Sequence, residues 1–186
     1  MLADVLMTLM LLLVVLAMRQ YVGMPIRVKG NSMLSTLHSG EVLLVSRVAL
    51  HTRGIQRGDV VICHYPGRYW DRWRLVRQSF VKRVMGLPGE TVEIIEGVVH
   101  INGEPVEEPY LDERHTRRRA SMPARILGDD EYFVLGDNRD SSNDSRRIGP
   151  IRSGDLVGVV TRVIWPLSAR RPIRPAESGF MENDAL

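Results

Sequence analysis

The chain has 186 residues, of which 44% are apolar and 25% are charged, and its formal net charge is +3. This composition is typical of globular proteins and excludes collagen-like, low-complexity and wholly disordered chains. The single cysteine, Cys63, excludes an internal disulfide and a zinc site built from several thiolates. Only two of the 25 basic residues are lysines, Lys29 and Lys82. Because a desolvated lysine loses its proton far more readily than an arginine, each lysine suggests a specific role.

An apolar run opens the chain, from Val5 to Met18, with Thr8 as its only polar residue. A membrane-spanning helix needs about 20 apolar residues, and apolar residues beyond Arg19 extend the run toward that length. No basic residue precedes the run and no small-residue cleavage site follows it, unlike in a cleavable signal peptide. We therefore expect residues 1–20 to form a membrane anchor with one transmembrane helix. The basic residues that follow the run favour a cytoplasmic location for the rest of the chain, since positively charged flanks usually stay in the cytoplasm.

From residue 21 onward the sequence has the pattern of β-structure. Short runs rich in Val and Ile are separated by turn signals, and Asn102-Gly103 predicts a hairpin with a type I′ turn. Runs at this spacing predict a mainly β fold, a compact antiparallel sheet or barrel that follows the N-terminal helix. We assign residues 21–166 to this domain and expect residues 167–186 to be a disordered tail. The predicted strands are 41–48, 59–65, 79–86, 91–97, 98–101, 132–136 and 155–165.

Two residues have the chemistry of a nucleophile and a base. Alternation within residues 79–86 places Lys82 on one face with Phe80 and Val84. A cation on an edge strand that prevents aggregation explains this position, but burial of Lys82 would instead give a neutral amine able to act as a base. Ser32, in a turn after Gly30, is a candidate nucleophile, although serine is also common in turns.

A long polar stretch, residues 136–147, directly follows an apolar run. It lacks the spacing of a calcium-binding loop, and its Asp, Arg and Ser side chains instead predict a fixed hydrogen-bond network beside a site. The five histidines are scattered, without the spacing of a metal site. The arginines of residues 114–125 are interpreted as a solvated loop rather than as a nucleic-acid-binding surface, because no nucleic-acid-binding motif accompanies them.

Four blocks of the sequence together resemble the bacterial type I signal peptidases, which are membrane-bound serine proteases with a Ser–Lys dyad. The blocks are GNSMLSTL, RGDVVICHYP, VKRVMGLPGE and GDNRDSSNDSR, in the family's order, and INGEPVEEPYL resembles the family's hairpin. The resemblance covers residues 24–165. It implies that Ser32 is the nucleophile and that Lys82 is the general base.

The resemblance also implies supporting roles. Ser142 would hydrogen-bond Lys82, and Asp144 would form an ion network with Arg83 and Arg146. The Ser32 N–H would form part of the oxyanion hole, and Gly30 stands where some relatives have a serine that supplies the second donor. The apolar residues expected to line pockets for small substrate side chains are Val28, Met33, Leu37 and Val81.

The implied reaction is cleavage of secreted preproteins after small residues, at A-x-A-like sites, through an acyl-enzyme and without a cofactor or metal. The implied partners are the signal-peptide region of preproteins and the lipid bilayer, with a membrane partner that completes the short anchor, and no nucleic acid. The family's topology places the catalytic domain outside the cytoplasm, against the charge bias. Ser35 replaces the motif's proline, so we expect a looser nucleophile loop.

Two alternatives stay open at this point. One is a self-cleaving Ser–Lys regulator, although only a short apolar run stands where a DNA-binding domain is expected. The other is a catalytically inactive, membrane-tethered β module in which Ser32 and Lys82 are merely turn and edge residues.

Overall fold

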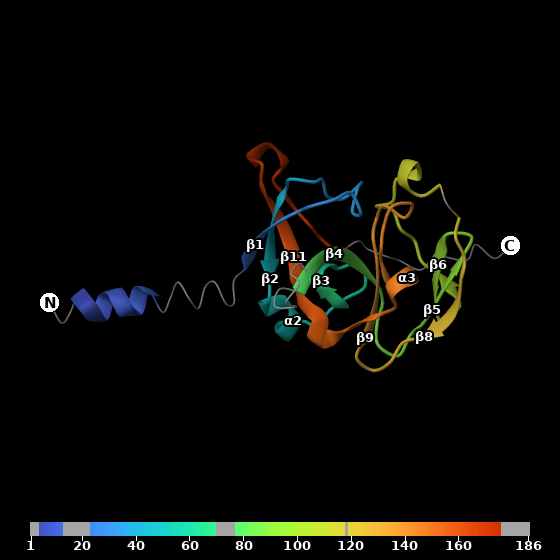
Figure 1. Ribbon diagram of the computed structural model, residues 1–186, viewed down its shortest axis with the longest axis horizontal. Helices are drawn as coiled ribbons and strands as arrows, with labels where there is room; N and C mark the ends of the chain where they lie inside the picture. The colour runs from blue at the N-terminus through green and yellow to red at the C-terminus, as the bar shows by residue number, and fades with distance from the viewer. Residues whose placement is uncertain (1–3, 13–22, 70–76, 118, 176–186) are drawn as a thin grey trace.

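The computed structural model describes residues 4–12, 23–69, 77–117 and 119–175 (Figure 1). Residues 4–12 are helical. Within the described ranges, no helix combines the length and the apolar character needed to cross a bilayer. The other residues of the predicted anchor, 1–3 and 13–20, lie outside these ranges, so the anchor stays a prediction.

The mainly β, antiparallel prediction is confirmed by two sheets (Figure 1). The large sheet has the order β1-β2-β11-β3-β4-β9-β10, and β12 also pairs with β11, on the edge opposite β2. Each predicted strand of this sheet is present within a few residues, whereas β1, β10 and β12 were not predicted. The bounds are β1 Met24–Arg27, β2 Val42–Ser46, β3 Val60–Tyr69, β4 Arg77–Gly86, β9 Glu131–Leu135, β10 Ile151–Arg152, β11 Leu156–Trp165 and β12 Arg171–Pro172.

The small sheet has the order β7-β6-β5-β8 and contains the predicted hairpin. Asn102 and Gly103 have φ values of 54° and 89°, as a type I′ turn requires, and Ile101 pairs with Glu104 across the turn. The strands are β5 Thr91–Ile95, β6 Val98–Ile101, β7 Glu104–Pro105 and β8 Met122–Ile126. The short helices are α2 Val48–Thr52 and α3 Ser145–Ile148, with 3-10 turns η1 Glu113–His115, η2 Ser153–Asp155 and η3 Leu167–Ala169.

Strand β4 connects three buried apolar clusters. Val81 packs on a cluster with Ile62 of β3, whereas Val84 belongs to a cluster on the opposite face. Met85 reaches the core of the small sheet. Successive side chains of a strand point to opposite faces. The packing of the neighbouring residues in these clusters therefore determines the face of β4 from which the Lys82 side chain projects.

The predicted disordered tail is wrong for residues 167–175. This segment forms η3 and β12, and Arg171 of β12 pairs with Val163 of β11. The Arg171 guanidinium also forms an ion pair of 2.8 Å with Glu41, so charge pairing and backbone hydrogen bonds order a segment without an apolar pattern. Residues 176–186 lie outside the described ranges.

Candidate active site

The loop that carries Ser32 is held at its base by the core. The Leu37 N–H donates to the Met33 carbonyl at 2.7 Å, and both side chains are buried. The Val28 N–H donates to the Glu41 carbonyl at 2.8 Å, which closes the loop where it leaves the sheet. These contacts leave Ser32 half-buried on the loop, within hydrogen-bond distance of Lys82 on β4.

Lys82 and Ser32 are in direct contact. Lys82 Nζ lies 2.8 Å from Ser32 Oγ and 2.9 Å from the Val81 carbonyl oxygen. The Lys82 residue is only 2% exposed, so the interpretation of Lys82 as a surface cation on an edge strand is wrong. The pairing of β4 with β3 and the Ser32 loop together cover the side chain.

Burial lowers the pKa of Lys82 below its usual value, because the charged ammonium is desolvated. Cys63, Asp144 and Asp137 act in the opposite direction. The Cys63 contribution requires a thiolate, but burial raises the pKa of that thiol to about 12, so Cys63 is neutral at ordinary pH. Desolvation is therefore opposed mainly by the two carboxylates.

The polar stretch 136–147 holds the backbone on both sides of the nucleophile. The Asn138 N–H donates to the Ser32 carbonyl at 3.0 Å, and Asn138 Nδ2 donates to the Asn31 carbonyl at 3.0 Å. Gly136 lies so close to Ser32 and Ser142 that a Cβ there would overlap the Ser32 carbonyl oxygen and Ser142 Oγ. The predicted hydrogen-bond network beside a site is thus present.

The predicted ion network is divided into two pairs. Arg83 does not pair with Asp144, as the resemblance implied, but forms a buried pair of 2.7 Å with Asp137. Asp144 pairs with Arg146 at 2.8 Å. Burial alone would raise the pKa of Asp144, but hydrogen bonding and charge pairing with Arg146 outweigh it and lower the pKa. The reason for the division is alternation, because Arg83 points to the face opposite Lys82.

Ser142 is close to the site but lacks the expected contact. Its buried hydroxyl interacts with Asp144, whose pKa it helps to lower, rather than with Lys82. The two acceptors of Lys82 Nζ are Ser32 and Val81 instead. The implied Ser142–Lys82 hydrogen bond is therefore not formed in this structure.

Sequence reasoning missed the contacts from the segment after β7. The Tyr110 ring lies 3.8 Å below the Arg83 guanidinium, and its hydroxyl donates to Glu108 at 2.6 Å. Glu108 forms a buried ion pair with Arg139 of the polar stretch. Nothing in the local pattern around Glu108 and Tyr110 signals Arg83 and Arg139, because both are distant in the sequence.

A groove of about 320 Å³ opens beside Ser32 and Lys82. Residues 26–30 form one wall and residues 78–82 form the other. Three predicted pocket residues, Val28, Met33 and Val81, line it, whereas Leu37 does not and is a fully buried core residue. Gly30, also in the wall, has a φ of 94° and open space where a side chain would stand.

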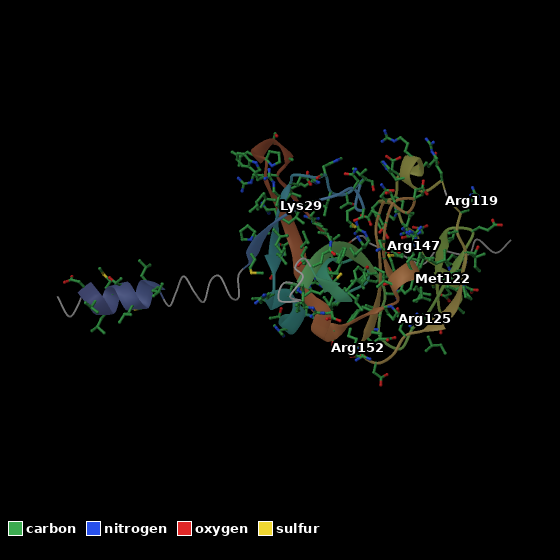
Figure 2. The ribbon with its side chains drawn as sticks, in the orientation of Figure 1. Lys29, Arg119, Met122, Arg125, Arg147 and Arg152 are labelled. Carbon is green, nitrogen blue, oxygen red and sulfur yellow. The ribbon has the colours of Figure 1, made fainter. Side chains whose placement is uncertain are left out.

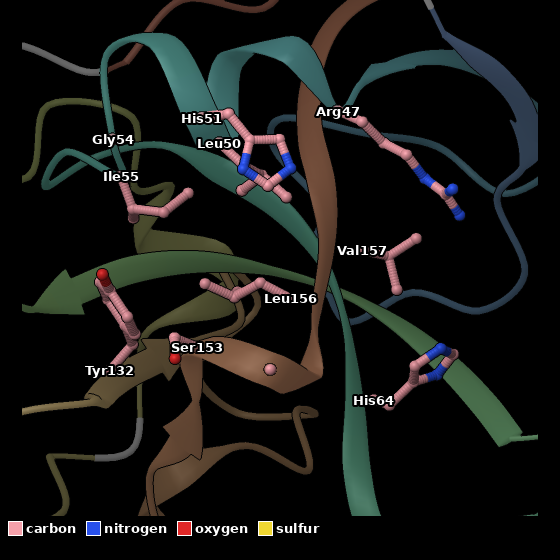
Figure 3. A pocket seen from close by; sticks show the side chains of 11 residues that line it. Arg47, Leu50, His51, Gly54, Ile55, His64, Tyr132, Ser153, Leu156 and Val157 are labelled. Carbon is pink, nitrogen blue, oxygen red and sulfur yellow. The ribbon is translucent and has the colours of Figure 1, made fainter. Parts of the chain in front are cut away.

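Another cavity, of about 640 Å³, is lined by α2, His64 of β3 and the start of β11 (Figure 3). It contains His51 and His64 but neither Ser32 nor Lys82. Within the described ranges, no cluster of three His, Cys, Asp or Glu residues has metal-binding geometry. Of these two cavities, the groove beside Ser32 is the one that contains both a candidate nucleophile and a candidate base.

Comparison with known proteins identifies the family. Residues 2–165 match the model of the family described as signal peptidase, peptidase S26. The chain is 35% identical to the probable signal peptidase I-1 of Synechocystis over 84% of this chain and 79% of that protein. It is 34% identical to signal peptidase I T of Bacillus subtilis, over 86% of this chain and 82% of that protein.

A solved structure of signal peptidase I from Enterococcus faecalis V583 is 32% identical, covers 57% of this chain and 97% of that one, and has a TM-score of 0.45. The family match spans the Ser32 loop, β4 and the polar stretch. The chain is a serine endopeptidase and belongs to the signal peptidase family, peptidase S26.

Proposed function

We propose that this chain removes signal peptides from secreted preproteins, with Ser32 as the nucleophile and neutral Lys82 as the general base. The observation that supports this most strongly is the 2.8 Å contact between Lys82 Nζ and Ser32 Oγ, with Lys82 buried. A buried amine that loses its proton readily keeps a lone pair for the hydroxyl proton of Ser32.

The reaction proceeds by acyl transfer. As Ser32 Oγ attacks the scissile carbonyl carbon, its proton passes to Lys82 Nζ. The C–N bond then breaks, Lys82 returns the proton to the leaving amine, and the signal peptide stays bound to Ser32 as an ester. A water molecule that gives a proton to Lys82 attacks this ester. The ester C–O bond then breaks, Lys82 returns the proton to Ser32 Oγ, and the signal peptide leaves with a free carboxyl group.

The negative charge on the tetrahedral oxygen needs hydrogen-bond donors. The Ser32 N–H is one candidate donor, and a backbone group or water substitutes for the side chain that Gly30 lacks. In other enzymes the loss of one such donor costs about 2.7–4 kcal/mol of transition-state stabilisation.

The groove fits an extended substrate segment. Strand β1 is at the edge of its sheet, and β9 pairs with β4 only from Arg83 onward, so residues 77–82 of β4 have a free edge. An extended peptide between these edges can pair with backbone groups. Val28, Met33 and Val81 leave a shallow apolar surface that favours small side chains such as alanine beside the scissile bond.

The membrane part of the proposal concerns residues 1–20. We expect them to anchor residues 21–166, the catalytic domain, on the extracytoplasmic side, where signal peptides emerge from the bilayer. The charge bias around the run opposes this topology, so we expect a membrane partner to complete the short anchor and to hold the N-terminus inside.

The test uses the full chain purified in detergent with a preprotein that has an A-x-A-like site. We expect cleavage after the last small residue, and loss of cleavage in Ser32→Ala and in Lys82→Ala. Lys82→Arg keeps the positive charge but cannot accept a proton, so it should also be inactive. Full activity of Lys82→Ala, with its fold checked by circular dichroism, would overturn the dyad.

Two controls separate the alternatives. Incubation of the chain without substrate tests the self-cleaving regulator, and a discrete fragment that is absent in Ser32→Ala would favour that function. A wild-type chain that cleaves neither itself nor preproteins would favour the inactive module.

A further inference from the structure

A second groove begins beside the dyad and follows the small sheet. Two cavities, of about 410 and 490 Å³, share Met122, Pro123, Arg146 and Arg147 in their linings, so they form one continuous groove. One wall is residues 120–125 of β8 and the segment before it, and the other is residues 139–150. We call this the β8 groove.

The β8 groove starts at the reaction centre. Its lining includes Ser142. The Ser142 side chain and the Ser32 carbonyl oxygen both lie against Gly136. It also includes Arg146, which pairs with Asp144, one of the carboxylates that act on Lys82. The β8 groove and the groove beside Ser32 have no lining residue in common. They meet at Gly136, which borders both Ser32, in the lining of one groove, and Ser142, in the lining of the other, so a chain that crosses Ser32 can pass from one groove to the other.

The exposed charges of the β8 groove are positive, because Arg125 and Arg147 are exposed whereas Glu131 and Asp140 are half-buried. Arg139 and Arg146 are in ion pairs, but the side chains of Arg125 and Arg147 have no ion pair or hydrogen bond within the described residues. Figure 2 labels Arg147 of α3 near Met122 and Arg125 of β8.

The groove also contains two carboxylates, and both have backbone partners. Glu131 accepts from the Gly128 N–H, and Asp140 accepts from the Arg117 N–H. These hydrogen bonds hold the two half-buried carboxylates against the protein backbone, whereas the two arginines are exposed to solvent. The charges that a bound peptide meets first are therefore positive and favour acidic side chains.

We propose that the β8 groove binds the first residues of the mature protein, on the C-terminal side of the scissile bond, and selects acidic side chains there through Arg125 and Arg147. This inference rests on the proposed function. Strand β8 is the edge of the small sheet, so an extended chain can lie along it. Pro123 removes one N–H donor from that edge, so arginine contacts rather than a full β-ladder give the selectivity.

The experiment compares two preprotein-derived peptides that are identical through the scissile bond. One has two Glu and the other two Lys among the third to sixth residues after the bond, and a third peptide has Gln. For the wild type we expect kcat/KM about threefold higher for the Glu peptide than for the Gln peptide at low salt, and lower for the Lys peptide. The difference should shrink with added salt, because the arginines are exposed to solvent.

Variants assign the effect to the groove. The double variant Arg125→Glu/Arg147→Glu should reverse the order of the Glu and Lys peptides, with each rate expressed relative to that of the Gln peptide in the same variant. Arg162→Ala is the matched control, because Arg162 is an exposed arginine of β11 outside the groove. Equal rates for all three peptides, or an unchanged order in the double variant, would overturn the β8 groove and leave the proposed function intact.

A binding measurement keeps the two proposals separate. Fluorescence anisotropy records the affinity of labelled mature-side fragments, with Glu or with Lys, for the wild type and the double variant. If no peptide is cleaved, the proposed function fails. Tighter binding of the Glu fragment, reversed in the double variant, would then still support the groove, and charge-independent binding would overturn it.

Discussion

Ser35 Oγ donates a hydrogen bond of 3.0 Å to the Tyr110 carbonyl oxygen, which ties the nucleophile loop to the segment after β7. Ser35 has a φ of 85°, in the left-handed region that proline cannot adopt. The position where the signal peptidase motif has proline therefore has a different backbone conformation in this chain. The hydroxyl contact fixes the turn that the sequence alone suggested would be looser.

Restoring the motif proline should harm this protein. Ser35→Pro must change φ by more than 100° and also lose the contact with Tyr110, so we expect a loss of unfolding free energy of about 2 kcal/mol. The fall in kcat/KM should be larger than for Ser35→Gly, which accepts the observed φ. Urea unfolding and peptide cleavage measure both effects. A Ser35→Pro enzyme as stable and active as the parent would contradict this account of the loop.

Activity should rise with pH toward the alkaline side. Burial lowers the pKa of Lys82, and only the neutral amine accepts the Ser32 proton, so kcat/KM increases as pH passes through that lowered pKa. Initial rates with a peptide that has no titratable group between pH 6 and 10 provide the profile. A flat profile over this range would be incompatible with Lys82 as the base.

The same lowered pKa affects stability with a definite sign. Between the native pKa of Lys82 and its ordinary value of 10.5, the unfolded chain binds the proton and the folded chain does not. Stability therefore rises with pH in this window, by about 1.4 kcal/mol per pH unit. Lys82→Met removes this pH dependence, and at the low-pH end of the window it should be more stable than the wild type. Urea unfolding of both proteins across the window tests it, and parallel pH curves would refute it.

The sequence predicts the two candidate catalytic residues better than it predicts the ion pairs that surround them. The Val-rich runs place β3 and β4 correctly, and the motif resemblance selects Ser32 and Lys82, which the structure brings to 2.8 Å. The partner of Arg83 was not predictable, because Asp137 and Asp144 are both carboxylates of the same polar stretch and the sequence does not distinguish them. Only the direction of the Arg83 side chain from β4 decides between them.

Loss of Asp137 should destabilise the fold. Its carboxylate and the Arg83 guanidinium are almost completely buried, so Asp137→Ala leaves a buried charge without its partner. We expect a loss of about 3–5 kcal/mol in the free energy of unfolding. Asp112→Ala is the control, because it removes an ion pair whose guanidinium is exposed, together with the cap of η1, and should cost only about 1 kcal/mol. Equal effects of the two variants, measured by urea unfolding, would show that burial of the Arg83 pair is unimportant.

Addition of one methyl group at Gly136 should abolish activity. A Cβ at this position overlaps the Ser32 carbonyl oxygen and Ser142 Oγ, neither of which is the end of a long flexible side chain. Gly136→Ala must therefore move the nucleophile loop away from β4, and a shift of about 1 Å in the Ser32–Lys82 contact costs on the order of 100-fold in rate. Gly154→Ala is the control, because a Cβ there meets nothing within 4 Å. We expect kcat to fall in Gly136→Ala and to stay at the wild-type level in Gly154→Ala. If Gly136→Ala kept full kcat, the contact of Gly136 with Ser32 would not determine the geometry of the dyad.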